Sequence, residues 1–131
     1  MAVHGEKSIL SLTWEAAEDL STAGQYRFVN LASDTTCELC DSAEAAVGVL
    51  QNNPESGRPA NVMVMGVTNL VAGGTITRLA KLTPDASGDA VATTSDDAEY
   101  SAIALEAAVD GDVFSALLCI GGSLSGSGDD S

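Results

Sequence analysis

Short apolar runs separated by polar turns recur along this chain, and they constrain its fold more than any other feature. The clearest example is the stretch 45–66, in which two apolar runs flank a polar turn that holds Pro, Gly and Asn. This pattern predicts a strand, a loop and a second strand. Turn signals return about every ten residues with no long helical pattern between them, which is typical of all-β barrels and sandwiches. We therefore predict an all-β fold.

A similar phrase returns near the end of the chain, over residues 102–121, around an acidic turn at 110–112. The two phrases lie about 55 residues apart, so we expect two loosely similar halves. Residues 43–50, at the start of the first hairpin, also have helical propensity. Gly48 and the stop at 52–54 interrupt that pattern, and we therefore predict a short strand there.

The chain has 131 residues, which suits one domain with extended ends. We expect an N-terminal arm and first strand over residues 1–14 and a β domain over residues 15–120. Residues 121–131 form a tail rich in Gly, Ser and Asp, a composition typical of a free chain end.

Acidic side chains dominate the charge of the chain. Nineteen Asp and Glu residues face five Lys and Arg residues, for a formal net charge of −14. Nucleic-acid phosphates and anionic membrane surfaces attract clusters of cations, so we expect neither as a direct partner. No apolar run reaches the ~20 residues of a membrane helix, and residues 1–8 lack the layout of a signal peptide. The charge instead suits a protein that exposes an acidic surface to solvent while it docks on a less acidic partner.

Aromatic residues make up only 4% of the chain, so its core must consist mainly of Ala, Val, Leu and Ile. Small side chains bury little area each, and apolar burial contributes roughly 25 cal/mol per Å². A domain of this composition gains stability when it buries more surface in an oligomer or on a larger body.

Few residues form a pattern with recognisable chemistry. Cys37 and Cys40 make a C-x-x-C in a strand-like run, and only Cys119 and His4 remain as further thiol or imidazole ligands. We interpret the thiols as inert and predict no metal or cofactor, while a redox or metal protein stays an alternative. The Asp-rich loops lack the spacing of a calcium site. Because no catalytic constellation is found, we predict that the chain is not an enzyme.

One concentrated apolar group lies outside the two hairpins, in the first expected strand. It consists of Ile9, Leu10, Leu12 and Trp14. Large apolar residues are usually buried in a core, but Trp is also enriched at the centres of protein interfaces. We predict that these four residues contact a partner, either by apolar docking or by strand addition.

The two hairpins resemble the small decoration, or cement, proteins of tailed-bacteriophage capsids. The resemblance rests on an ordered series of short motifs between about residues 43 and 120. The series runs GVLQN at 48–52, an alternating strand into GV at 66–67, AGG at 72–74, and ALEAA at 104–108 followed by GD at 111–112.

This resemblance implies a β-barrel or β-tulip-like domain with an extended N-terminal arm and a C-terminal tail. It implies a homotrimer on the outer surface of the virion, bound between subunits of the major capsid protein, that stabilises the shell. The family offers no catalytic residues. A stand-alone β domain that binds a ligand such as a glycan is the alternative, and it predicts a monomer with an exposed aromatic pocket.

Overall fold

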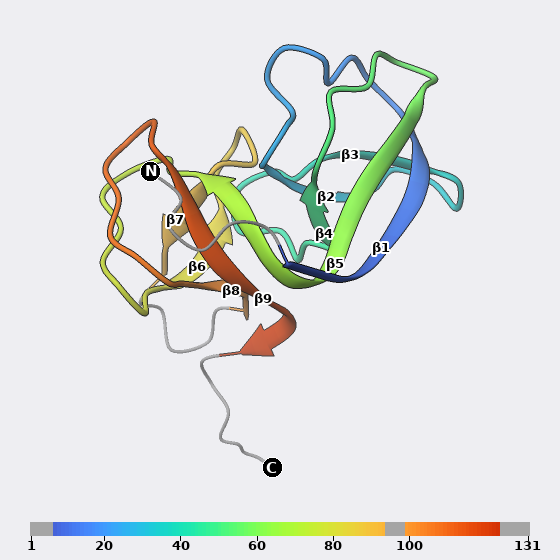
Figure 1. The fold of residues 1–131 in the computed structure, drawn as a ribbon. Helices are drawn as coiled ribbons and strands as arrows, with labels where there is room; N and C mark the ends of the chain where they lie inside the picture. The colour runs from blue at the N-terminus through green and yellow to red at the C-terminus, as the bar shows by residue number, and fades with distance from the viewer. Residues whose placement is uncertain (1–6, 94–98, 124–131) are drawn as a thin grey trace.

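The chain forms nine β-strands and no helix in the residues that this computed structural model describes, which are 7–93 and 99–123. The strands gather into two groups side by side, and β5 runs from one group into the other (Figure 1). The predicted all-β, barrel-like fold is confirmed. The strands are β1 (Lys7–Ala16), β2 (Phe28–Leu31), β3 (Thr36–Leu39), β4 (Gly48–Leu50), β5 (Pro59–Val71), β6 (Lys81–Pro84), β7 (Ala90–Ala92), β8 (Glu99–Ala104) and β9 (Val113–Ser123).

The first five strands close into a ring. Antiparallel pairs join β3 to β2, β2 to β4, β4 to β5 and β5 to β1. A short parallel pairing between the end of β1 and the start of β3 completes the circle, with Glu15 opposite Thr36. Closing a sheet on itself removes free strand edges and encloses a small core.

Strands β5 to β9 repeat this pairing scheme. Antiparallel pairs join β5 to β9, β9 to β8, β8 to β6 and β6 to β7. A parallel bridge from Ala72 to Ala90 links the end of β5 to β7. Each strand corresponds to the one four places earlier, and β6 begins 53 residues after β2 (Lys81 against Phe28). The two similar halves expected from the sequence are therefore confirmed as two five-stranded rings that share β5.

The buried side chains form two clusters of mostly small aliphatic residues, and the one that fills the second ring also takes in Phe28, Val49 and Met63 of the first. Val62 of β5 belongs to the cluster inside the first ring, whereas Leu70 belongs to the cluster that fills the second. Gly66, with φ at 130°, lies between these two positions of the shared strand. The two largest fully buried side chains are Phe28 and Phe114. Small residues at most core positions agree with the low aromatic content of the sequence.

Several strand boundaries differ from the sequence-based prediction, among them the end of β1 at Ala16 and the end of β9 at Ser123, inside the expected tail. The strand expected over residues 43–50 is only β4, because the chain turns at Ala43, where φ is 60°, and the Ala43 amide donates to the Pro84 carbonyl in the second ring (2.9 Å). The runs expected on either side of Gly66 form one continuous strand, β5. A contact between the rings therefore replaces sheet pairing at Ala43.

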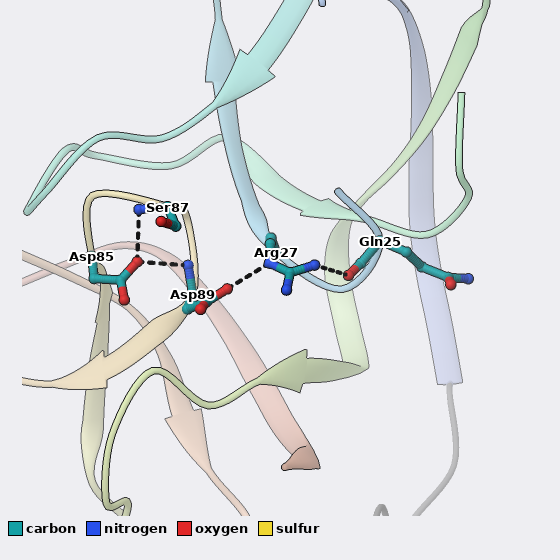
Figure 2. A network of polar contacts seen from close by, with 5 residues as sticks. All are labelled: Gln25, Arg27, Asp85, Ser87 and Asp89. Atoms are coloured by element: carbon teal, nitrogen blue, oxygen red, sulfur yellow. Dashed lines mark hydrogen bonds and ion pairs between the residues drawn. The ribbon is translucent and has the colours of Figure 1, made fainter. Parts of the chain in front are cut away.

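A polar network joins the two rings beside β2 (Figure 2). Arg27 donates through Nε to Asp89 Oδ1 at 2.5 Å, and Asp85 accepts the amides of Ser87 and Asp89 at 2.8 and 3.0 Å. The Phe28 amide also donates to the Gly88 carbonyl at 2.9 Å. Burial raises the pKa of Asp89 above its ordinary value, and the hydrogen bond and charge of Arg27 oppose that rise.

Candidate functional site: an exposed apolar groove

Strand β1 carries a β-bulge where the predicted contact residues begin. Ser8 pairs with Gly66 of β5 and Leu10 pairs with Met65, so Ile9 is an extra residue between two consecutive positions of β5. A bulge bends its strand and redirects a side chain out of the regular alternation. Ile9 is the most exposed large apolar residue in the described part of the chain, at 76%.

Ile9 forms part of the wall of a groove between β1, β5 and β9, which we call the apolar groove. Its volume is about 500 Å³. Among the described residues no charged side chain lines it, although the chain as a whole has a net charge of −14. The lining residues are Ile9, Val64, Met65, Gly66, Leu117, Leu118, Cys119 and Ile120.

Sequence reasoning missed the contributions of β5 and β9 to this groove. Met65 is 51% exposed, Leu117 40% and Ile120 39%. The register of the shared strand brings them together, because Val67 of β5 lies opposite Leu117 of β9. Leu117 stands between buried neighbours at an outward-facing position of its strand, where a polar residue is the usual choice. An apolar residue at such an outward-facing position is the one signal in the sequence that could have indicated the contribution of β9 to the groove.

The four predicted contact residues do not form a single cluster. Ile9 lines the apolar groove and Leu10 pairs with Met65 beside it. Leu12 is 43% exposed and pairs with Val62 further along β1. Trp14 is half-buried, packs against the core of the first ring, and lies outside the groove. Their contact with a partner therefore stays a prediction, and the structure favours Ile9 and Leu10 as its centre.

Trp14 lines a second, smaller pocket at the other end of β1, which we call the Trp14 pocket. It has a volume of about 420 Å³. Its walls come from the end of β1, the turn between β2 and β3, and the segment that leads into β5. The lining residues are Thr13, Trp14, Glu15, Asp34, Thr35, Gly57 and Pro59.

The C-x-x-C thiols are buried on opposite sides of a strand. Cys37 packs in the core of the first ring and Cys40 in the cluster that fills the second. Side chains three positions apart along an extended chain point to opposite faces, which explains this separation. Both are free. Burial raises the pKa of Cys37, with Glu18 adding to it, and burial together with Glu44 and Glu38 raises the pKa of Cys40 to about 12. A thiol held protonated is a poor nucleophile and a poor metal ligand, so the structure supports the interpretation as inert.

The acidic loops serve local structure where they are described. Asp85 and Asp112 accept backbone amides within their own turns. In residues 7–93 and 99–123, no three His, Cys, Asp or Glu side chains gather as a metal site would need. The same residues include no helix long and apolar enough to cross a membrane. His4 lies outside the described part of the chain, as do Asp96 and Asp97 of one Asp-rich loop and Asp129 and Asp130 of the expected tail.

The double ring with an exposed apolar groove defines a small structural β domain, and comparison with known proteins identifies its family. The model of the phage cement protein family matches residues 4–120, so the chain belongs to that family. No curated protein matches the chain. Among solved structures, it resembles the N base of the head fiber gp8.5 of bacteriophage phi29, with a TM-score of 0.69 and 19% sequence identity. The match covers 86% of this chain and 96% of that one, and at this identity it concerns the fold.

Family membership confirms the resemblance drawn from the sequence. The chain is a capsid-associated structural protein of a bacteriophage, and its place is on the exterior of the virion capsid. The match begins at residue 4 and so includes β1, which the sequence-based resemblance left out.

Proposed function

We propose that this protein binds the outer surface of the capsid between subunits of the major capsid protein and stabilises the shell, without catalytic activity. The observation that carries this proposal is the apolar groove, which no charged side chain of the described residues lines, on a strongly acidic molecule. Contiguous exposed apolar surface on a small domain is a common mark of a protein interface. Within a family of capsid proteins, the capsid is the natural partner for such a surface.

The size of the groove residues sets the scale of the interaction. Burying a Leu, Ile or Met side chain completely contributes ~1.5–3 kcal/mol. Ile9 and Met65 retain 76% and 51% of their surface, so each contributes roughly 1–2 kcal/mol when the capsid covers it. Leu117 and Ile120 add smaller amounts because they are already more buried. One copy therefore binds weakly through this surface alone.

A homotrimer, which the cement family suggests, would overcome this weakness. Three linked copies that engage three equivalent capsid sites bind far more tightly than one copy, because the second and third contacts are intramolecular. A closed, symmetric trimer also fits positions where three capsid subunits meet. Charge repulsion between acidic copies opposes association at long range, so we propose that apolar contacts hold the trimer together.

Substitutions at the groove test this function without breaking β1. Strand β1 pairs with β5 at eight positions and closes the first ring, so a deletion of residues 1–14 would damage the fold as well as the contact. The double variant Ile9→Asp/Met65→Asp changes only side chains that are already mostly exposed. A control is Val109→Asp, which places one such negative charge at a 58% exposed apolar residue outside the groove.

The readout is the number of copies that bind purified capsids lacking the protein, together with the mass of the free protein and its circular dichroism. We expect the double variant to keep its fold and lose capsid binding, while Val109→Asp binds as the wild type does. Wild-type occupancy by a folded double variant would refute the groove as the contact. A monomer in solution that also fails to bind capsids would favour the alternative, a stand-alone ligand-binding domain.

A further inference from the structure

The Trp14 pocket combines an aromatic ring with two carboxylates, neither of which forms an ion pair within the described part of the chain. Trp14 is half-buried against the core, and the side chains of Glu15 and Asp34 are exposed. Among the described residues the one ion pair is that of Arg27 with Asp89 in the network between the rings. Neither pocket carboxylate therefore has a cationic partner within this part of the chain.

The walls of the pocket are held in place by backbone hydrogen bonds between its three segments. The Glu15 amide donates to the Thr35 carbonyl at 3.0 Å, which fixes β1 against the turn between β2 and β3. Ala16 donates to the Arg58 carbonyl and accepts from the Gly57 amide, both at 2.9 Å, which fixes β1 against the segment before β5. A site whose walls are already ordered spends little entropy on binding.

We propose that the Trp14 pocket binds an arginine side chain of the capsid protein on which the molecule docks, an inference that rests on the proposed function. A guanidinium group is flat, stacks on a Trp ring, and donates two parallel hydrogen bonds to a carboxylate. Trp14 supplies the ring, and Asp34 and Glu15 supply the acceptors. Trp and Arg are also enriched among the residues that contribute most of the binding energy at protein interfaces.

The charge of the chain argues that the arginine comes from a partner. The chain has 19 acidic residues and only five Lys and Arg residues, so a second copy is a poor source of cations. Arg58 lies between two lining residues but does not line the pocket itself. Trp14 lies five positions after Ile9 along β1, a span of ~16 Å. A single capsid surface can therefore reach both the pocket and the apolar groove.

Trp14 is the only Trp of the chain, so its fluorescence reports on this pocket alone. The probes are N-acetyl-arginine amide, N-acetyl-lysine amide and methyl glucoside, each titrated at constant ionic strength. We expect a saturable change with the arginine probe, a weaker one with the lysine probe and none with the sugar. Asp34→Asn should weaken the arginine response about tenfold. The control Asp110→Asn removes the same charge at an exposed turn outside the pocket and should leave the response unchanged.

A response to the sugar alone, or no saturable response to arginine, would overturn the proposal. Capsid binding then tests the source of the arginine. We expect Asp34→Asn to lower the affinity for capsids lacking the protein about tenfold, and Asp110→Asn to leave it unchanged. If Asp34→Asn binds normally while Ile9→Asp/Met65→Asp does not, the pocket proposal fails and the proposed function stands. If both variants bind normally, both proposals fail. If Asp34→Asn changes the mass of the free protein, the arginine comes from a second copy of this chain and not from the capsid, and the pocket proposal fails.

Discussion

Replacement of Gly48 by alanine tests the close packing of β4 on β5, which closes the first ring. Gly48 is buried, and a Cβ added there would lie 2.4 Å from the Met63 carbonyl oxygen and 2.6 Å from Val62 Cγ1. Both distances are shorter than real carbon contacts, and one neighbour is backbone that can move only if the two strands separate. We therefore expect Gly48→Ala to destabilise the protein although it adds only one methyl group.

The size of this effect follows from two opposing contributions. Overpacking a well-packed site costs ~1–3 kcal/mol, and a clash with backbone belongs at the upper end of that range. Replacing glycine lowers the conformational entropy of the unfolded chain, and this stabilises the folded state by ~0.4–1 kcal/mol. The net loss is about 2 kcal/mol, which for a domain of this size lowers the melting temperature by roughly 6–10 °C.

The matched control is Gly74→Ala, because an added Cβ at Gly74 meets no atom within 4 Å. We expect its melting temperature to equal that of the wild type or to rise slightly. Both variants are measured by thermal unfolding at one protein concentration, since association would shift the midpoint. Equal melting temperatures for Gly48→Ala and the wild type would refute the packing of β4 on β5 described here.

Two further predictions concern titratable groups. Because burial raises the pKa of Asp89, the folded protein binds this proton more readily than the unfolded chain, so the contribution of Asp89 to stability falls as pH rises from about 4 through the folded pKa. In urea unfolding we expect the wild type to lose stability relative to Asp89→Asn over that window, and the opposite trend would mean that the ion pair with Arg27 outweighs burial. Cys37 and Cys40, whose thiol pKa values are raised, should react with a thiol reagent at neutral pH only as fast as the protein unfolds, and rapid labelling of both in the native state would contradict their burial.

Much of the fold could be predicted from the sequence because its signals are local. Alternating apolar residues and regular turns predicted an all-β chain, and the repeated phrases at 45–66 and 102–121 revealed the two halves. The ring closures were invisible, since the parallel pairing between β1 and β3 involves only two residue pairs and leaves no sequence pattern. The contact of Ala43 with Pro84 joins distant parts of the chain and leaves no local sequence signal. The sequence therefore predicts a strand over residues 43–50, although β4 begins only at Gly48.

The candidate site was only partly predictable, for the same physical reason. Ile9 and Leu10 could be found because they are concentrated in one short run. Met65, Leu117 and Ile120 join them through the pairing of β5 with β1 and β9, which requires the three-dimensional register. An extended strand also carries neighbouring residues apart, so Trp14 lies at the other end of β1 from Ile9 and lines a different pocket.

The orientation of the bound protein on the virion tests the central proposal most directly. A cryo-electron microscopy map of particles that carry the protein would show which face of the double ring meets the shell. We expect the apolar groove between β1, β5 and β9 to lie against the major capsid protein, with Ile9 and Met65 covered. A map in which this groove faces solvent, while another surface contacts the capsid, would contradict the account.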